Sequence, residues 1–405
     1  MKTDRALLVL VIAVLAAAAI IYAMKRSPES PEPVVAEDRA GDLELVVVGI
    51  EGLEPSIVER LAAEGRMPVM ADLMERGAAI EFTNLGNDIG SEISWACVAA
   101  GAVPVAKPIG WTKEAEPGDK YPFAMRPTAL WTVASDEGKS VAVVGWPGTW
   151  PVADVNGIMV GPYSPYVLAR EHGDDTTPGV SPVSLLDEID PLMITWKRIP
   201  RRSLAEFFRQ DASLGFEALI GYNYKVLQKA LGGDRSMLDV SRYSVTQAGD
   251  QLFVFLPGLN DVSQRFWHYY EPDVRDRSLE IVGDPEYFAL LAEALSITID
   301  RYYEYIDGVI GTLLSWAAED ATVAVVSDHG ISGVSFDANG HPRIGVEMYS
   351  DRGLCVIAGP RVAGGERTAD AAIHDIAPTI AEAAGLPVPP QAEGTARQAV
   401  LVSPR

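Results

Sequence analysis

Short runs of β-branched and other apolar residues recur along the chain and predict buried strands. The first is LELVVVGI at residues 43–50. Further runs of this kind lie at residues 140–146, 156–161, 251–256, 321–326 and 353–358. Near-continuous apolar runs are typical of strands that are buried on both faces, as in parallel sheets. We therefore expect a sheet that is covered on both sides.

Between these runs, apolar residues recur with the spacing of one helix face. Helical patterns open at Pro55, cover residues 71–76 and 91–100, and fill the long region 287–316. Residues 165–248 are less regular, and we interpret them as a mostly helical insertion. Strands that alternate with helices predict an α/β fold, with a central, mostly parallel sheet and helices on both faces.

The beginning of the chain differs in composition from the rest. Residues 6–24 form a run of 19 uncharged, mostly apolar residues with basic residues on either side. As a helix the run would span about 28 Å, close to one hydrocarbon thickness. It is longer than the apolar core of a signal peptide, about 7–15 residues, although small residues at 16–19 leave cleavage open. We predict a transmembrane signal anchor.

This anchor defines the expected organisation of the chain. Residues 1–5 would be cytoplasmic, and residues 25–42, rich in Pro and acid, would form an extended linker. The folded domain at residues 43–402 would then lie outside the cytoplasm, on the periplasmic or extracellular side. The predicted protein is single-pass and contacts the membrane through its N-terminal helix.

Charge and cysteine content narrow the choice of partners. The net charge of −23 argues against a nucleic-acid partner, because phosphate binding needs a basic face. No pattern in the sequence identifies a protein partner. Cys97 and Cys355 make no disulfide framework and are expected to be small core residues, although the fold could still pair them.

Side chains that can bind a metal follow several predicted strands. Glu51 follows the first, Asn260 comes just after the strand at 251–256, and Asp328 and His329 end the run VAVVSDHG. The carboxyl ends of parallel strands meet at one edge of a sheet. Carboxylate and imidazole groups suit zinc or a similar divalent ion. Alone, however, an Asp-His pair is also common as a helix cap or a salt bridge.

Ser91 opens the helical pattern at 91–100. Free N–H groups and the helix dipole favour an anion such as phosphate at this position. A hydroxyl group there can act as a nucleophile if a metal lowers its pKa. Serine is also a favoured N-cap residue, so both interpretations of Ser91 stay open.

Longer motifs resemble a known family. VVVGIEGLEPSIVERLAAEGRMPVMADLMERGA, SEISWACVAAG, LNDVSQRFWHYYEPD and VVSDHG resemble the type I phosphodiesterase/nucleotide pyrophosphatase group of the alkaline phosphatase superfamily. GLCVIAGP and HDIAPTIAEAAGLPVP extend the resemblance to the end of the domain. It covers residues 43–165 and 250–402 and implies an alkaline phosphatase-like fold, but it says nothing of the insertion.

The resemblance also implies chemistry. Active members use two divalent ions, commonly zinc, and hydrolyse phosphoric esters. The positions that match the ligands of one ion are Glu51, Ser91, Asp328 and His329, with Ser91 as the nucleophile. Glu51 is one methylene longer than the usual Asp. Lys107 stands where many relatives have a His, and its charge could contact phosphate, although a solvated lysine is the alternative.

The positions that match the other ion have changed. Asn260 and Gln264 replace the family's Asp and His, and Tyr349 replaces a late His. Neutral amides and a phenol are poor zinc ligands, so we expect this second site to be lost and only one ion, zinc being the expected metal, to remain. Nearby side chains that could rebuild it are Asp261, His268 and His341.

Two functions follow as hypotheses. The favoured one is a membrane-anchored pseudoenzyme that binds a phosphoester, another anionic ligand or a partner. The alternative is a slow one-metal phosphodiesterase or phosphatase that forms a phosphoseryl intermediate on Ser91. A sulfatase is disfavoured because no Cys/Ser-x-Pro-x-Arg motif surrounds Ser91, and a lipid head-group phosphotransferase because only one membrane span is visible.

Four further residues could be mistaken for functional ones. His374 begins the last helical pattern and is expected to be a cap or packing residue. Three aromatic residues follow Gln264 in the same motif: Trp267, Tyr269 and Tyr270. They are expected to line the core or a pocket rather than to stack on a nucleotide base.

Overall fold

The computed structural model describes most of the predicted domain. The described residues are 42–86, 89–106, 123–125, 127–150, 152–162, 179–213, 222–281, 283–331 and 349–402. The predicted anchor at 6–24, nearly all of the predicted linker, Lys107 and His341 lie outside them. Within the described ranges, no helix is both long enough and apolar enough to cross a membrane.

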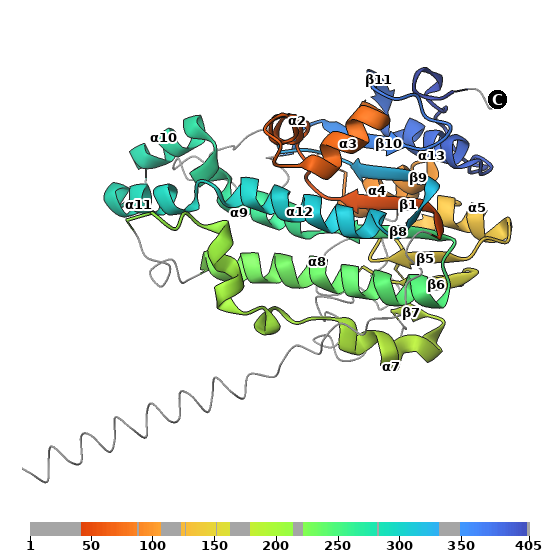
Figure 1. Cartoon of the computed structure of the whole chain (residues 1–405), viewed down its shortest axis with the longest axis horizontal. Helices are drawn as coiled ribbons and strands as arrows, with labels where there is room; N and C mark the ends of the chain where they lie inside the picture. The colour runs from red at the N-terminus through yellow and green to blue at the C-terminus, as the bar shows by residue number, and fades with distance from the viewer. Residues whose placement is uncertain are drawn as a thin grey trace, which may run out of the picture. The chain divides into compact units, whose positions relative to one another are not determined.

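A nine-stranded sheet forms the centre of the fold (Figure 1). In spatial order its strands are β11 (Glu366–Ala372), β2 (Ala78–Thr83), β10 (Arg352–Ala358), β9 (Ala317–Ser327), β1 (Leu43–Ile50), β8 (Gln251–Leu256), β5 (Val141–Val144), β6 (Gly157–Val160) and β7 (Val180–Ser181). Only β10 and β7 run antiparallel to their neighbours in this sheet. The predicted mostly parallel sheet is therefore confirmed. A separate antiparallel pair joins β3 (Val105–Ala106) and β4 (Phe123–Met125).

Each predicted strand is present, but three strands of the large sheet were not predicted. These are β2, β7 and β11. The β2 sequence AAIEFT and the β11 sequence ERTADAA contain Ala and charged residues, so neither forms the continuous apolar run typical of a central strand. Of the two, β11 forms the edge of the sheet and is mostly exposed, whereas β2 lies between β11 and β10 and is mostly buried.

The helices connect these strands. They are α2 (Pro55–Ala63), α3 (Pro68–Arg76), α4 (Ser91–Ala100), α5 (Leu130–Asp136), α7 (Leu186–Ile189), α8 (Tyr222–Gln247), α9 (Gly258–Tyr270), α10 (Pro272–Ile281), α11 (Pro285–Leu295), α12 (Thr298–Leu314) and α13 (Ile376–Ala384). Short 3₁₀ turns are η2 (Val183–Leu185), η3 (Asp190–Leu192), η4 (Trp196–Arg198), η5 (Arg201–Phe207), η8 (Ile373–Asp375) and η9 (Gln398–Val400). The region predicted as one long helical stretch at 287–316 contains two helices, α11 and α12. The described part of the insertion is mostly helical, as predicted.

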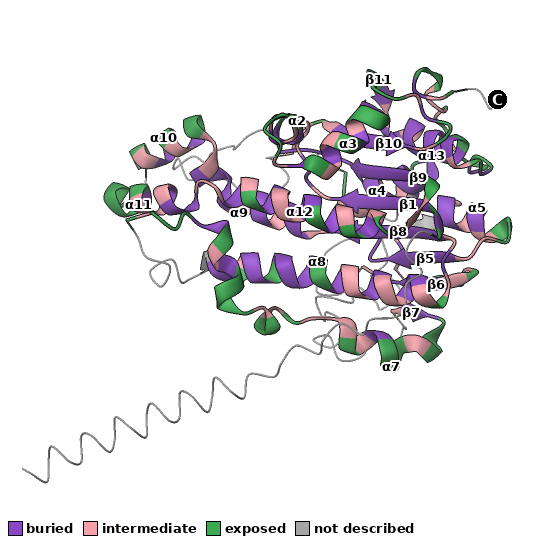
Figure 2. Cartoon of the chain, in the orientation of Figure 1, coloured by how far each residue is buried: buried purple, intermediate pink, exposed green. Residues whose placement is uncertain are grey.

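Successive strand residues face two different cores, one on each side of the sheet. Val46 and Val48 pack with residues of α2, α3, α8, α9 and α12. Leu45 and Val47 pack with residues of α4, α5 and α13. Figure 2 shows the central strands almost wholly buried between these layers. Cys97 and Cys355 are free thiols buried in the second core, as expected for small core residues.

Candidate active site at the carboxyl edge of the sheet

Three parallel strands deliver polar residues to one edge of the sheet. β1 lies between β8 and β9, with Ile50 paired to Leu256 and Gly49 paired to Val326. Glu51 and Asp328 therefore leave the sheet on the same side, as the strand pattern predicts. Asn260 lies in the first turn of α9, which follows β8 directly. Gly52 has a φ of 80° in the turn after β1, and its backbone packs on Asn260.

Helix α4 brings Ser91 to this edge. It packs closely on β1 because Gly49 has no Cβ; a Cβ there would lie 2.8 Å from the ring of Trp95. The N-cap of α4 is Gly90, and Ser91 is the first helical residue. The Ser91 hydroxyl donates a hydrogen bond to Glu51 Oε1 at 2.7 Å. The N-cap interpretation of Ser91 is therefore wrong, and its side chain is held against a predicted ligand.

Glu51, Asp328 and His329 lie together behind Ser91. His329 Nε2 lies 4.0 Å from Glu51 Oε1 and 3.8 Å from Asp328 Oδ1. His329 Nδ1 lies 3.0 Å from the carbonyl oxygen of Gly330, which can only accept, so Nδ1 carries the proton and Nε2 a lone pair. Asp328 Oδ1 and His329 Nε2 are buried and have no hydrogen-bond partner among the described residues.

Burial sets the electrostatics of this group. It raises the pKa of Glu51 and of Asp328, and the nearby Asp328 charge raises the pKa of Glu51 further. Burial also lowers the pKa of His329, which keeps the imidazole neutral. Two buried carboxyl groups and a bare imidazole nitrogen form a set of acceptors that a cation would satisfy.

These residues fit a divalent ion in the type of donor they offer, and zinc accepts this combination of oxygen and nitrogen. The distances between these ligand atoms, 3.8 and 4.0 Å, are longer than in a site closed around an ion. Ligand atoms at about 2.0–2.1 Å from a tetrahedral zinc lie about 3.3 Å apart. Among the residues that the structure describes, no three His, Cys, Asp or Glu side chains are placed to hold one ion as they stand. The metal site thus stays a prediction.

The three positions expected to have lost the other ion also lie together. Asn260 Nδ2 donates to the Tyr349 hydroxyl oxygen at 3.2 Å, and Gln264 Nε2 donates to the same oxygen at 2.9 Å. The Tyr349 ring stacks on His329, with ring centroids 3.7 Å apart and an interplanar angle of 21°. We call Asn260, Gln264 and Tyr349 the neutral cluster. Burial raises the pKa of Tyr349 to about 12, so its phenol is uncharged at neutral pH.

The proposed substitutes for those ligands are less well placed. His268 lies two turns further along α9, where its ring packs on Tyr269 at 3.9 Å, and burial lowers its pKa to about 4. His268 is therefore a core residue. Asp261 lies within electrostatic range of Glu51, although burial raises its pKa.

Trp267 has the packing role that the sequence predicts. Trp267 is 5% exposed and packs on Tyr270 at 5.6 Å, which supports the core interpretation. His374 lies just before α13, and its Nε2 is 3.6 Å from Glu393.

A buried carboxylate that we did not predict fixes the start of α9. Asp234 of α8 is fully buried. Its Oδ1 accepts from the backbone N–H of Gly258 at 3.0 Å, and its Oδ2 accepts from the Tyr302 hydroxyl at 2.6 Å. No pattern in the local sequence ALGGDRSMLDV singles out Asp234. Through Gly258, the insertion holds the helix that carries Asn260 and Gln264.

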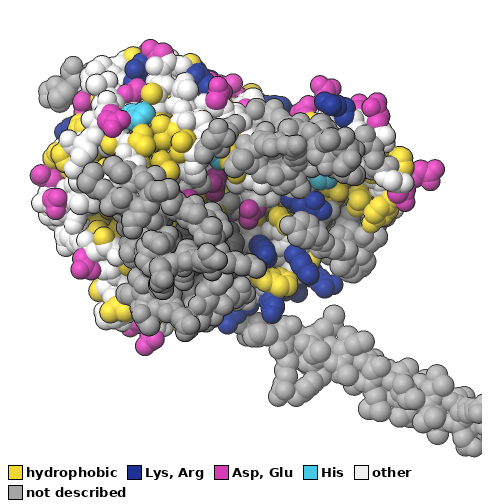
Figure 3. All heavy atoms as spheres, turned by 180° about the vertical axis from the view of Figure 1, so that it is seen from behind, with side chains coloured by type: hydrophobic (Ala, Val, Ile, Leu, Met, Phe, Trp, Pro, Cys, Tyr) yellow, Lys and Arg dark blue, Asp and Glu magenta, His cyan; other side chains and the backbone are white. Residues whose placement is uncertain are grey.

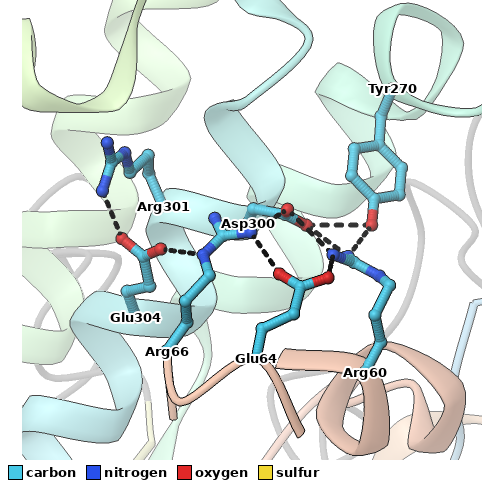
Figure 4. Close-up of polar contacts among 7 residues, drawn as sticks. All are labelled: Arg60, Glu64, Arg66, Tyr270, Asp300, Arg301 and Glu304. Atoms are coloured by element: carbon cyan, nitrogen blue, oxygen red, sulfur yellow. Dashed lines mark hydrogen bonds and ion pairs between the residues drawn. The ribbon is translucent and has the colours of Figure 1, made fainter. Parts of the chain in front are cut away.

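A polar network holds the other end of α9 (Figure 4). Tyr270, the last residue of α9, donates to Asp300 Oδ1 at 2.9 Å. Arg60 contacts both, at 2.7 Å from Asp300 Oδ1 and 2.6 Å from the Tyr270 hydroxyl. Burial opposes ionisation of Asp300, but hydrogen bonds from Arg60 and Tyr270 lower its pKa overall. The network joins α2, α9 and α12, so the helix of the neutral cluster is fixed at both ends.

A cavity of about 140 Å³ lies elsewhere, between α2, α3 and the strands β2, β10 and β11. Glu81 and Arg367 line it, and none of the predicted site residues does. The polar constellation at Ser91, not this cavity, is the candidate site.

Solved structures with similar folds belong to several phosphatases and sulfatases. The alkaline phosphatase PafA has 10% identity over 89% of this chain and 99% of its own, with a TM-score of 0.49. A putative sulfatase from Bacteroides thetaiotaomicron has 12% identity over 88% and 74%, with a TM-score of 0.48. The phosphonate monoester hydrolase from Silicibacter pomeroyi has 12% identity over 88% and 76%, with a TM-score of 0.44. Similarities of this size carry no inference about chemistry.

Sequence comparison is more specific. No curated protein matches the chain significantly. Residues 45–379 match the family described as type I phosphodiesterase / nucleotide pyrophosphatase. The matched region starts in β1, contains Glu51, Ser91, Asp328 and His329, and ends in α13. The chain therefore belongs to the type I phosphodiesterase/nucleotide pyrophosphatase family.

Proposed function

We propose that this protein is a membrane-anchored pseudoenzyme of its family, which binds a phosphoester or another tetrahedral anion beside Ser91. The observation that carries the proposal is the neutral cluster. Two amide groups donate to one phenol oxygen, and the phenol ring covers one face of His329. The three side chains of the neutral cluster are uncharged and hydrogen-bond to one another. They therefore supply no negative charge to offset a divalent ion at this position.

The consequence for catalysis is large. A second cation in a two-metal site stabilises charge on the phosphoryl group and helps to activate water. Removing even one donor to a developing oxyanion costs about 10²–10³ in rate. A protein that lacks the whole second metal site is therefore expected to bind a phosphoester but not to hydrolyse it at an enzymatic rate.

The other half of the site supports anion binding. If a divalent ion binds, Glu51, Asp328, His329 and the Ser91 oxygen are the residues that would hold it, and it would supply positive charge for the ligand. Ser91 lies at the N-terminus of α4, whose free N–H groups and dipole favour an anion. The part of the site around Ser91 then serves to bind a ligand rather than to hydrolyse it.

A slow hydrolase is the second candidate, and the hydrogen bond from Ser91 to Glu51 favours it. Ser91 Oγ would attack phosphorus while its proton passes to Glu51 Oε1, which accepts that hydrogen bond at 2.7 Å. The bond from phosphorus to the leaving oxygen breaks with its electron pair staying on that oxygen, which takes a proton from solvent, and a phosphoseryl group forms on Ser91. Water then breaks the phosphoseryl bond, which restores the hydroxyl group and releases the phosphate or monoester.

One experiment separates the two candidates. Metal content after zinc loading and turnover of an aryl phosphodiester are measured for the wild type, Ser91→Ala and Ser94→Ala. Ser94 is a buried serine one turn along α4 and serves as the matched control. A pseudoenzyme shows no turnover that depends on Ser91. Turnover lost only in Ser91→Ala, with one ion per chain, establishes the slow hydrolase instead.

Restoring the lost side chains tests the reason for inactivity. The triple variant Asn260→Asp, Gln264→His, Tyr349→His is expected to bind one more ion than the wild type and to gain turnover. Two tightly bound ions in the wild type would contradict the proposal, because the neutral cluster would then not have replaced a cation.

We also propose that residues 6–24 anchor the protein in a membrane, with the folded domain on the periplasmic or extracellular side. The length and apolar composition of that run support the anchor.

A further inference from the structure

Two stretches of the insertion carry positive charge without any acid. Residues 191–205 contain Lys197, Arg198, Arg201 and Arg202, and no Asp or Glu. Residues 222–233 contain Lys225 and Lys229, again with no acid. The whole chain has a net charge of −23, so six cations in these stretches are a strong local reversal. We call these six residues the basic surface.

The fold brings the two stretches together. Residues 194–201 run antiparallel to the first half of α8. Three contacts along the two segments fix this antiparallel arrangement. The backbone N–H of Ile194 donates to Ser236 Oγ at 2.7 Å, and Gln228 Nε2 donates to the Ile199 carbonyl at 2.6 Å. The Arg201 guanidinium lies 5.1 Å from the centre of the Tyr224 ring. Lys225 and Lys229 directly follow Tyr224 and Gln228 on the helix. The cations of η4 and η5 therefore lie beside them.

These cations are exposed and available. Each of the six is exposed, and none forms an ion pair with another residue in the described part of the chain. By contrast Arg235, on the same helix, is paired and binds Asp239 at 2.9 Å. Figure 3 shows a group of Lys and Arg side chains low on one face, where only a few acidic side chains lie close by. Unpaired surface cations create a positive potential that attracts anions.

The basic surface extends toward the candidate site. Asp234 of α8 binds the first residue of α9, Gly258, and Asn260 follows two residues later. Lys229 lies five residues before Asp234, which corresponds to about 7.5 Å along the helix axis. Lys229 also acts electrostatically on Asp261, the neighbour of Asn260, where it opposes the rise in pKa that burial causes.

We propose that the basic surface binds the distal phosphates of a linear polyphosphate chain whose terminal phosphate occupies the site at Ser91. The inference rests on the proposed function for the Ser91 end, and it adds the ligand class: a chain of repeated phosphates rather than a neutral ester. The insertion then acts as the specificity element of the domain. Cations spaced along a helix suit a linear polyanion, because each repeat meets another positive charge.

The test is binding of medium-chain inorganic polyphosphate to the full-length protein in neutral detergent, measured by calorimetry. The variant Arg201→Gln/Arg202→Gln is compared with Arg209→Gln/Lys139→Gln, which removes the same charge from exposed, ion-paired residues outside the basic surface. We expect the first variant to bind at least about tenfold more weakly and with a shallower salt dependence. Equal affinities in the two variants overturn the proposal.

A second comparison separates this proposal from the proposed function. Ser91→Ala is expected to lose orthophosphate binding and to keep polyphosphate binding through the basic surface. If orthophosphate never binds but polyphosphate binding still depends on Arg201 and Arg202, the proposed function fails and the basic surface stands. If those substitutions abolish binding to vesicles of anionic lipid but leave polyphosphate binding intact, the surface contacts membranes and the present inference is wrong.

Discussion

Tyr349 shows how much of this site depends on single atoms. Its hydroxyl oxygen accepts from both Asn260 and Gln264, and its ring stacks on His329. One side chain thus links the neutral cluster to the group of Glu51, Asp328 and His329. Its phenol oxygen holds both amide groups in place.

Tyr349→Phe removes only this acceptor and keeps the ring. Because two partly buried amide donors lose their partner, we expect the free energy of unfolding to fall by about 1–3 kcal/mol. Urea denaturation measures the change. Tyr243→Phe is the control, since no hydrogen bond of its hydroxyl is seen among the described residues, and it should change stability by less than about 0.5 kcal/mol. Equal effects of the two substitutions would contradict the described cluster.

Asp234 predicts a pH dependence. Burial raises its pKa from 3.8 to about 7. Between these values the folded protein keeps a proton that the unfolded chain releases, so stability falls as pH rises through this window and is constant above it. One proton accounts for at most about 1.4 kcal/mol per pH unit.

Asp234→Asn removes this titrating group and can keep both hydrogen bonds. Urea denaturation at pH 5 and pH 8 should therefore show the wild type losing more stability than the variant over that interval. Parallel pH profiles for the two proteins would rule out Asp234 as the source.

At the scale of elements, α9 is fixed at both ends. Asp234 binds its first residue, Gly258, and the network of Asp300 and Arg60 binds its last, Tyr270. The residues between carry Asn260 and Gln264, so their position relative to Tyr349 depends on two contacts outside the candidate site.

Gly258→Ala tests the first contact. A Cβ at this position would lie 2.2 Å from the Tyr302 hydroxyl and 2.5 Å from Asp234 Oδ2. We expect a loss of about 1–3 kcal/mol from overpacking. Gly308→Ala, in the interior of α12 with nothing within 4 Å of the added carbon, should instead stabilise by about 0.5–1 kcal/mol. Thermal or urea unfolding distinguishes them, and a tolerated Gly258→Ala would show that α9 is not held in this way.

At the scale of the whole molecule, the proposed anchoring assigns different tasks to residues 6–24 and to the folded domain. The domain has two apolar cores of its own, one on each face of the sheet. A tether would keep that domain at a membrane surface without taking part in its fold.

Deleting residues 6–24 is expected to release the protein from the membrane. The full-length chain should stay in the membrane pellet after alkaline extraction, because a run of this length can span the hydrocarbon core. Deleting residues 27–41, within the predicted linker, serves as a control and should leave the protein in the pellet. Extraction of the full-length protein by alkali alone would argue against a spanning helix.

The local sequence predicted much of this architecture. Apolar runs identified the central strands, because a strand buried on both faces needs apolar side chains at every position. The strand β2 was not predicted, because Glu81 and Thr83 interrupt the apolar residues of AAIEFT. The separate helices α11 and α12 were merged for a similar reason, since their helical patterns are nearly continuous.

By itself, the sequence determined most of the central strands and helices, the family, and the residue types available at the sheet edge, because these depend on local periodicity and on motifs. Tertiary structure alone decided what those residues do to one another. It directed Ser91 to Glu51 rather than to its own helix, and it joined Asn260 to Tyr349 across 89 residues of chain. It also placed Asp234 beneath Gly258. Such contacts depend on how helices pack on the faces of the nine-stranded sheet, and no local pattern of side chains encodes that packing.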